Sequence, residues 1–279
     1  MTHVRGKITT VVTIAFLSLL CLLFVLPIFI VLFNSFKGQF FIANAPFALP
    51  NTETFVGLLN YKNGIAKIGF FSAFGYSLLI TVLSVFGILL TASMTAWYVT
   101  RVRGRGVKAL YYALVFSMIV PFQMVMFTMS RVANLLHLEN PLGIVVLYIG
   151  FGAGMSVFMF SGFVRGIPVA LEEAAEIDGC NPIKTFFYVV FPLLKPTAIT
   201  IAILNAMWIW NDYLLPYLVI GSRYRTIPVA VQYLQGGYGS RDMGALMAML
   251  ILAIIPIIIF YAFSQKSIIS GVVAGAVKG

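Results

Sequence analysis

The sequence predicts an all-α integral membrane protein with six transmembrane helices. Of its 279 residues, 61% are hydrophobic and only 9% are charged, whereas about 25% of the residues of a soluble domain are charged. Its long uncharged runs exceed the roughly 20 residues that a helix needs to cross a hydrocarbon core. These runs lack the alternating polarity of outer-membrane barrel strands, which favours helices. The expected spans are about 8–33, 71–100, 109–130, 141–163, 196–222 and 243–263.

Four parts follow from these spans. Residues 1–7 form a basic leader, 8–70 hold the first span and an outer segment, 71–265 form the main transmembrane domain, and 266–279 form a polar tail too short for another crossing. With the N-terminus inside, the 18 Lys and Arg residues divide into eleven inner and seven outer ones, and the short loop RVRGRGVK contributes most of this difference. This asymmetry predicts that both termini and the charged loop at 167–192 are cytoplasmic.

The charged loop lies between two apolar runs and reads IPVALEEAAEIDGCNPIKTFFYVVFPLLKP over residues 167–196. It holds four of the eight acidic residues of the chain, Glu172, Glu173, Glu176 and Asp178. At about 100° per residue, a helix here places the three Glu residues on one face and apolar residues on the other. The like-charged pair Glu172–Glu176 destabilises an isolated helix by a few tenths of a kcal/mol. Asp178 lies at the C-terminal end of this helix, where the helix dipole disfavours a negative charge. These penalties predict an external partner.

Turn residues divide this loop into two helices. Pro168 suits the first turn of a helix, and Gly179 suits the left-handed position at its end. Asn181 followed by Pro182 is typical of the cap and first residue of a second helix. We therefore predict a helix–turn–helix that leaves the membrane and returns.

Catalytic and metal-binding patterns are not found in the sequence. There is no GxxxxGK[ST] loop for phosphates, no HExxH and no CxxC. The two Cys residues, Cys21 and Cys180, are expected at different depths, and no basic region is interleaved with aromatic residues as in nucleic-acid binding. We expect no catalytic residue, no metal site and no cofactor on this chain. Transport, driven by energy supplied elsewhere, is the natural class.

Polar residues within the spans are candidates for a solute pathway: Gln123, Asn205, Trp208, Asn211 and Asp212. Asp212 is the only acid within a predicted span, and such residues are functional candidates. It lies near the outer interface, where a salt bridge or an interfacial position is an equal alternative. Gly150 and Gly154 have the spacing of close helix contacts, although bending of the helix is the other interpretation.

Four motifs in order carry a family resemblance. Glu173-Ala174-Ala175 followed by Gly179 and by prolines before a span resembles the EAA loop of importer-type ABC transporter permeases. WNDYLLP at 210–216, TIPVAVQYLQGGYG at 226–239 and AGAVKG at 274–279 resemble the carbohydrate-importer permeases, specifically the second, shorter permease of maltose-type importers. The likeness covers most of the chain from about Phe70 onward, with Cys180 and Met243 as departures from the family pattern.

The resemblance implies a type I ABC importer permease fold and a multi-component transporter. This transporter contains two permeases, here expected as a heterodimer, in a bacterial or archaeal inner membrane, two ATPase subunits that bind ATP and Mg²⁺, and an external solute-binding protein. The coupling residues that would contact the ATPase are Glu172, Glu173, Ala174, Ala175, Asp178, Gly179 and Pro182. The resemblance assigns Ala274, Gly275 and Lys278 to a second ATPase contact, and Gln235, Gly236, Gly237, Tyr238 and Gly239 to a loop that reaches the binding protein.

Alternatives remain at each step. The acidic loop could be an ordinary interfacial helix with solvated carboxylates, and the Gly-rich loop could be a plain turn. The runner-up function is an ABC importer permease for another solute, such as an amino acid or a polyamine. An ion-coupled secondary transporter would require intramembrane charge pairs, and Asp212 alone does not supply them. A membrane enzyme lacks any catalytic constellation.

Overall fold

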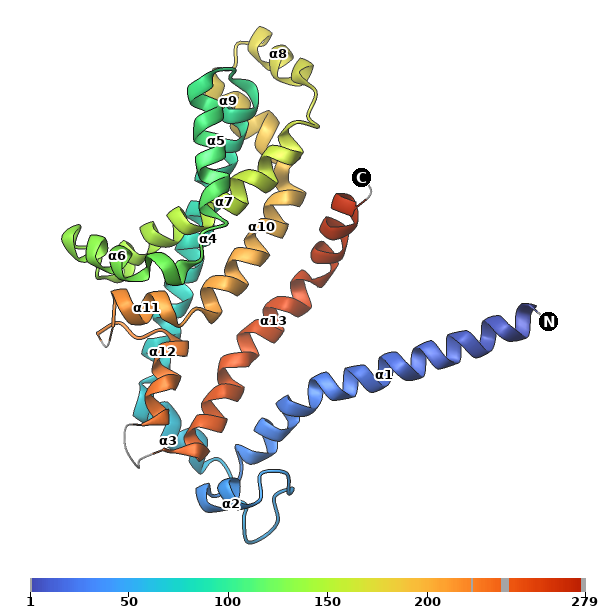
Figure 1. The fold of residues 1–279 in the computed structure, drawn as a ribbon, viewed down its shortest axis with the longest axis vertical. Helices are drawn as coiled ribbons and strands as arrows, with labels where there is room; N and C mark the ends of the chain where they lie inside the picture. Colours follow the sequence, from blue (N-terminus) through green and yellow to red (C-terminus); the bar gives the residue numbers. More distant parts are fainter. Residues whose placement is uncertain (1, 222, 237–240, 277–279) are drawn as a thin grey trace. The chain divides into compact units, whose positions relative to one another are not determined.

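The computed structural model describes residues 2–221, 223–236 and 241–276, and the side chains within these ranges from residue 10 to residue 265. Every regular element in this part of the chain is a helix (Figure 1). The elements, in order, are α1 (Thr2–Asn34), α2 (Gln39–Asn44), α3 (Leu59–Ile68), α4 (Phe70–Arg101), α5 (Arg105–Ser117), α6 (Phe122–Leu135), α7 (Pro141–Val164), α8 (Val169–Ile177), α9 (Pro182–Thr185), the π-helix η1 (Phe186–Val190), α10 (Phe191–Asn211), α11 (Leu214–Val219), α12 (Ile227–Gln232), the 3₁₀-helix η2 (Tyr233–Gln235) and α13 (Met243–Ala276).

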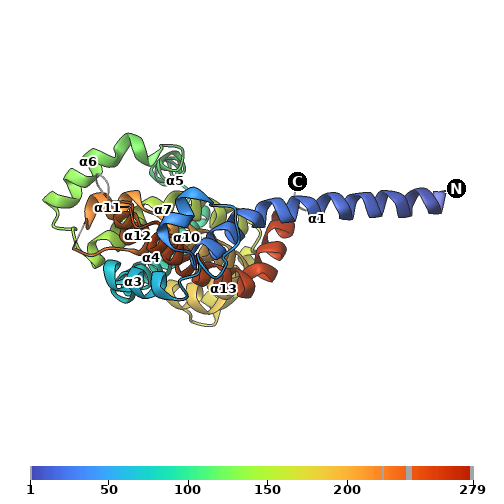
Figure 2. The ribbon, with the colours of Figure 1, turned by 90° about the horizontal axis from the view of Figure 1, so that it is seen from below.

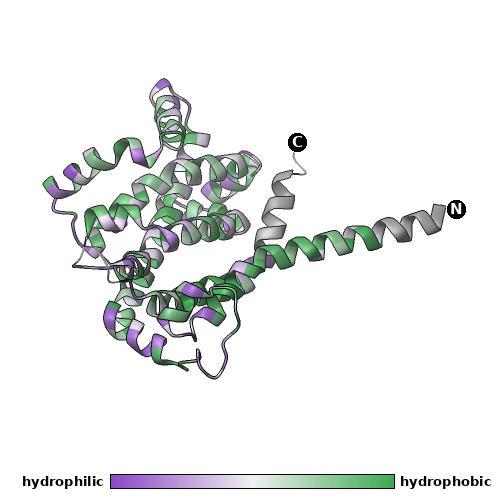
Figure 3. Ribbon diagram, turned by 60° about the horizontal axis from the view of Figure 1, so that its bottom comes forward, coloured by the Kyte–Doolittle hydropathy of each residue, from purple (hydrophilic) through white to green (hydrophobic). Residues whose placement is uncertain are grey.

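The membrane-spanning class is confirmed. Among the described residues, five helical segments are long and apolar enough to cross a membrane, and a bent pair of helices makes a sixth if it counts as one span. The five segments are Thr10–Asn34, Phe70–Arg101, Pro141–Val164, Pro182–Asn211 and Met243–Gln265. Hydrophobic residues run along these helices, as the green colouring of α1 beyond its grey end shows in Figure 3.

The predicted span at 109–130 differs from the structure. Instead of one straight helix, α5 ends at Ser117 and α6 begins at Phe122, and the helical direction bends by 108° between them. Figure 2 shows this bend. Pro121 precedes α6 in an extended conformation. Because Pro has no N–H and disfavours helical backbone in the residue before it, it ends α5 and allows a new helix to begin.

Two other boundaries also move. The helical path that was expected to start at Pro196 starts at Pro182 and passes through η1 into α10. It stops at Asn211, because Asp212 adopts an extended backbone. The last helix, expected to end near residue 263, continues through Ala276.

Two compact units make up the chain, Met1–Phe70 with Ala230–Pro256, and Phe71–Val229 with Ile257–Gly279. The first unit contains an unusual buried cation, Lys37, whose side chain is 1% exposed. Its Nζ donates to the carbonyl oxygens of Ala45 at 2.7 Å and Ala48 at 2.9 Å. Burial without a carboxylate lowers the pKa of Lys37.

The second unit has two hydrophobic clusters, both built on α4, α7 and α10. One cluster contains buried residues near the charged loop: Ala92, Ala96, Val157, Phe160, Val164, Phe186, Val190, Leu194, Ala198 and Ile201. The other cluster lies toward the opposite ends of these helices: Ile80, Ile88, Ile144, Tyr148, Ile209 and Leu215.

Glycines on α7 allow close packing at chosen points. A Cβ at Gly154 would lie 2.5 Å from the carbonyl oxygen of Leu114 on α5, and one at Gly152 would lie 2.5 Å from Ile88 on α4. A Cβ at Gly150 would meet nothing within 4 Å. Close approach, rather than bending, therefore explains Gly154, while Gly150 takes no part in it.

Candidate functional site

The charged loop forms the predicted helix–turn–helix. α8 ends at Ile177, and Gly179 adopts a left-handed backbone with φ +81°. The N–H of Gly179 donates to Glu176 O at 3.0 Å, and that of Cys180 donates to Ala175 O at 2.9 Å. This pair of bonds is the Schellman motif, which satisfies carbonyls at a helix end and favours Gly at the left-handed position.

The second helix starts as the sequence predicts. The Asn181 side chain accepts the N–H of Lys184 at 2.9 Å, and Pro182 is the first residue of α9. Asn at the cap and Pro at the first position are both favoured there, because the cap supplies an acceptor and Pro lacks only a donor that would be unpaired. The turn geometry is therefore encoded locally.

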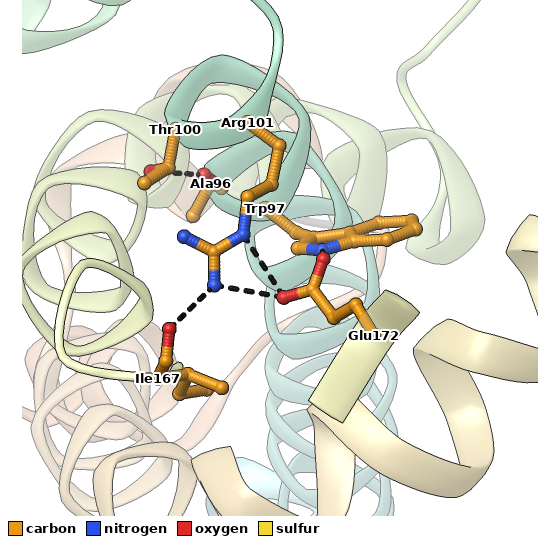
Figure 4. Close-up of polar contacts among 6 residues, drawn as sticks. All are labelled: Ala96, Trp97, Thr100, Arg101, Ile167 and Glu172. Carbon is orange, nitrogen blue, oxygen red and sulfur yellow. Dashed lines mark hydrogen bonds and ion pairs between the residues drawn. The ribbon is translucent and has the colours of Figure 1, made fainter. Parts of the chain in front are cut away.

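One carboxylate of α8 is paired inside the chain. Nε and Nη2 of Arg101, the last residue of α4, donate to Oε1 of Glu172 at 2.9 and 2.7 Å. The indole Nε1 of Trp97 donates to Oε2 of Glu172 at 2.9 Å, and Arg101 Nη2 also reaches Ile167 O at 2.9 Å (Figure 4). The Arg101 and Glu172 side chains are 18% and 8% exposed. This cluster, here called the α4–α8 clamp, fastens α8 to the end of α4.

The clamp changes the expectation that the acidic face of this helix needs an external partner, because Glu172 has its partners within the chain. Glu172 is buried, while Glu173 and Glu176 are exposed. The apolar residues Leu171 and Ile177 are 45% and 86% exposed. Arg101, which is 71 residues away in sequence, holds Glu172 in this buried position. The surface that α8 leaves open is therefore mixed, apolar and acidic.

Aromatic side chains pack against the Trp97 ring of the clamp. Phe186, which is fully buried, lies 5.6 Å from the Trp97 ring and 5.1 Å from the Phe187 ring, measured between centroids. These Phe residues belong to η1, a single π-helical turn between α9 and α10. Such turns are rare and occur frequently at functional sites. Trp97 thus joins the polar clamp to the hydrophobic cluster of α7 and α10.

A second polar group lies at the far end of α10. The Tyr148 hydroxyl donates to Oδ2 of Asp212 at 2.9 Å, while Oδ1 of Asp212 accepts the N–H of Leu214 at 3.0 Å. The Trp208 ring meets the Tyr148 ring edge-on, with centroids 5.5 Å apart. Trp208 and Asp212 are thus brought together by Tyr148, which sequence reasoning missed. A lone Tyr in an otherwise apolar span signals a hydroxyl that needs a partner.

The other pathway candidates are not part of this group. Asn205 is buried, and its Nδ2 donates to Ser156 Oγ at 3.2 Å and to Ile201 O at 2.9 Å. Asn211 donates to Met207 O at 2.7 Å within its own helix. Gln123 is exposed in the first turn of α6. The structure therefore distributes the five candidates over four places.

Comparison with known proteins places this architecture. The family described as "Binding-protein-dependent transport system inner membrane component" matches residues 88–273, a stretch that includes the clamp residues Trp97, Arg101 and Glu172. The chain belongs to this family. Its curated relatives are named transport system permeases, so the chain is a transport subunit and not an enzyme.

Two of these relatives match almost throughout. The "Probable starch degradation products transport system permease protein AmyC" of Thermoanaerobacterium thermosulfurigenes is 38% identical over 277 residues, covering 99% of this chain and 98% of the relative. The "Multiple sugar-binding transport system permease protein MsmG" of Streptococcus mutans is 37% identical over 262 residues, covering 92% and 93%. A chain in the crystal structure of a bacterial ABC transporter that imports alginate superimposes with TM-score 0.76 at 23% identity, covering 94% of this chain and 97% of that one. The permease fold of an ABC importer is therefore confirmed.

The loop and tail positions of this family member are described only in part. Gln235 ends η2, and Gly236 follows it with φ +64°, whereas Gly237, Tyr238 and Gly239 lie outside the described residues. Ala274 and Gly275 belong to the backbone of α13, and Lys278 also lies outside. Within the described residues, no cluster of three His, Cys, Asp or Glu could hold a metal ion.

In the first unit, a salt bridge joins α3 to the residue before α13. Lys67 Nζ donates to Oδ2 of Asp242, whose Oδ1 accepts the N–H of Ala245 at 3.0 Å. Burial alone would raise the pKa of Asp242, but the hydrogen bonds from Lys67 and Ala245 and the Lys67 charge together lower it. This contact secures the start of the last span.

Proposed function

We propose that this chain is the permease subunit of an ATP-driven, binding-protein-dependent sugar importer. It would form half of the translocation path and connect to an ATPase subunit through residues 167–192. The observation that carries the proposal is the α4–α8 clamp. It attaches a short exposed helix to a membrane-spanning helix by buried, charge-assisted hydrogen bonds.

The clamp has the properties that a coupling element needs. Nine residues are too few for a stable isolated helix, so α8 depends on its attachment to the rest of the unit. Each hydrogen bond to a charged group contributes about 1.5–3 kcal/mol, and Glu172 accepts three of them. A displacement of α8 would thus be transmitted to the end of α4, because the directional hydrogen bonds to Glu172 and the packed aromatic rings hold the two helices together.

The open surface of α8 supports an ATPase partner. Leu171 and Ile177 would enter an apolar groove, while Glu173, Glu176 and Asp178 would face basic groups at its rim. The sequence has no phosphate-binding loop, so ATP and Mg²⁺ would bind to the partner. In this arrangement both termini and α8 are cytoplasmic, as the distribution of Lys and Arg predicts.

The relatives' names support sugar as the solute. They include transport systems for starch degradation products, multiple sugars and arabinooligosaccharides. Trp208 on α10 is 41% exposed and Asn211 is exposed, so the helix presents an indole ring and an amide, which suit the apolar and hydroxyl faces of a sugar. A second permease would supply the other half of the path, and an external binding protein would deliver the solute.

The proposal is tested by substitutions on the open face of α8 in the assembled transporter. Glu173→Ala should lower both uptake of a labelled oligosaccharide and binding-protein-stimulated ATP hydrolysis roughly tenfold, the effect of losing about 1.4 kcal/mol at an interface. Glu53→Ala, which removes an exposed acid from the outer segment, is the matched control and should leave both unchanged. Normal uptake and hydrolysis in the Glu173 variant would contradict coupling through α8.

Two further arms separate the other candidate functions. Uptake that persists after removal of the ATPase subunits would instead indicate an ion-coupled transporter. A panel of labelled oligosaccharides, amino acids and polyamines decides the solute, and uptake restricted to amino acids or polyamines would overturn the sugar assignment while leaving the coupling intact.

A further inference from the structure

A polar cavity beside the clamp has no role in the proposed coupling. It lies between α4, α5 and α7, has a volume of about 230 Å³, and is lined mainly by Thr100, Lys108, Tyr111, Tyr112, Ser161 and Arg165. This volume is below the roughly 300–1,000 Å³ of pockets for drug-sized ligands. It suits a compact polar group.

The charge of the cavity is positive. Lys108 and Arg165 both line it, no carboxylate does, and neither cation has a salt bridge among the described residues. Arg165 lies over the Tyr111 ring, with its Cζ 5.9 Å from the centroid. This contact orients the guanidinium along the cavity wall, since cations are attracted to aromatic faces.

The partial charges at the nearby helix ends reduce the positive charge of the cavity but leave it positive. α4 and α7 end beside the cavity, and each C-terminus contributes about half a negative charge. The uncapped N-terminus of α5, where Lys108 is the fourth residue, contributes about half a positive charge. With two full cations, the sum is about +1.5 charges, so an anion is favoured.

The lining of the cavity includes an unsatisfied hydroxyl. Ser161 is 1% exposed, and its Oγ has no hydrogen-bond partner among the described residues. A buried hydroxyl without a partner costs about 1–3 kcal/mol. An oxygen-rich ligand, directly or through a water molecule, would supply the missing acceptor or donor. Two cations without a salt bridge among the described residues, one unpaired hydroxyl and a compact volume together describe a phosphate-sized anion.

We infer that this cavity binds a phosphate group, presented either by the headgroup of an anionic membrane lipid or by free phosphate. Basic pockets between transmembrane helices at the cytoplasmic side bind anionic headgroups. The inference rests on the proposed function only for the side of the membrane. Lys108 is the last residue of the basic loop RVRGRGVK, which the proposed orientation places at the cytoplasmic surface.

Native mass spectrometry of the purified complete transporter tests the inference. One arm adds phosphatidylglycerol, a second adds inorganic phosphate, and phosphatidylcholine serves as the reference lipid. Each neutralised cation should weaken anion binding roughly fivefold, so the double variant Lys108→Gln/Arg165→Gln should bind roughly 25-fold more weakly. Retention of phosphatidylglycerol identifies the lipid as the source, and retention of phosphate identifies the free anion.

Two matched variants control for charge and folding. Lys62→Gln/Arg131→Gln removes the same net charge from exposed positions outside the cavity and should bind as the wild type does. Lys108→Arg/Arg165→Lys keeps both charges and should retain binding, which shows that the cavity tolerates substitution. Equal binding of the anions by the wild type and the neutralised double variant would overturn the inference. Loss of coupling in the Glu173 variant leaves this readout unaffected, because lipid retention does not require ATP hydrolysis.

Discussion

Breaking the α4–α8 clamp from one side should cost more stability than removing it whole. In Arg101→Met, the carboxylate of Glu172 stays buried, with only the Trp97 indole as a partner. Removing one member of a buried ion pair costs about 3–5 kcal/mol. Because the Arg101 side chain is 18% exposed, the lower value applies, and about 3 kcal/mol corresponds to a fall of roughly 6–12 °C in Tm for a domain of this size.

The double-mutant cycle isolates the pair. Arg101→Met/Glu172→Met removes both charges and leaves two flexible apolar side chains, so it should cost roughly 2 kcal/mol less than Arg101→Met alone. Thermal unfolding of the purified transporter in detergent gives the four Tm values. The matched control is Lys67→Met. Its side chain is 54% exposed in the salt bridge to Asp242, and such a pair contributes about 0–1 kcal/mol.

Additive effects would refute this reasoning. If the single variants each lower Tm by no more than the Lys67 variant, and if the double variant equals their sum, the clamp behaves as a solvated surface pair. The exposed fractions of Arg101 and Glu172 would then not describe the assembled transporter.

Three further outcomes follow from single positions. Gly154→Ala should lower stability by about 1–3 kcal/mol, because its Cβ would meet the backbone of Leu114, whereas Gly150→Ala should leave thermal unfolding unchanged or improve it by replacing a helical Gly. Gly179→Ala should cost about 1 kcal/mol in the same assay, entirely from its left-handed backbone, since no atom lies within 4 Å of the added Cβ. The lowered pKa of Asp242 stabilises the folded state at pH values above the unfolded pKa of about 3.9. This stabilisation is lost as the pH falls through the folded pKa, and it amounts to less than about 1 kcal/mol because the salt bridge is exposed. Asp242→Asn should therefore abolish the fall of Tm with falling pH that this group causes.

The parts of the fold that the sequence predicted are those with local causes. The turn between α8 and α9 depends on Gly179, Asn181 and Pro182, whose preferences concern neighbouring backbone groups, and the structure places each as predicted. The start of α7 follows likewise from Asn140, whose side chain accepts two backbone N–H groups, and from Pro141.

Long-range contacts were beyond such reasoning. Helical periodicity placed Glu172 on the acidic face of its helix but could not show its pairing with Arg101, because periodicity treats the helix as isolated. The side chain that orients α8 comes from the end of α4, and no local pattern marks Arg101 among the other basic residues of its loop. The break at Pro121 was also missed, since a Pro within an apolar run is often tolerated by neighbouring helices. Here α5 packs against α7, whereas α6 packs against α11.

Asp212 is best understood from how its two oxygens are used. Oδ1 accepts the N–H of Leu214 at the start of α11, and Oδ2 accepts the Tyr148 hydroxyl, so both oxygens already have a partner within the chain. Asp212→Asn keeps an acceptor for Leu214 and offers its amide to the Tyr148 oxygen, which can accept as well as donate. We therefore expect Asp212→Asn to keep uptake within about threefold of the wild type.

Asp212→Ala should behave differently. It leaves the buried Tyr148 hydroxyl unpaired at a cost of about 1–3 kcal/mol and removes the acceptor for the N–H of Leu214 at the start of α11, so Tm should fall together with uptake. Tyr148→Phe separates the hydrogen bond to Asp212 from the packing of the Tyr148 ring, because it removes the hydroxyl and keeps the edge-on contact with Trp208. A large loss of uptake in Asp212→Asn at unchanged Tm would contradict the structural role and would make this carboxylate a solute contact, since only a ligand would then distinguish the charged group from its neutral isostere.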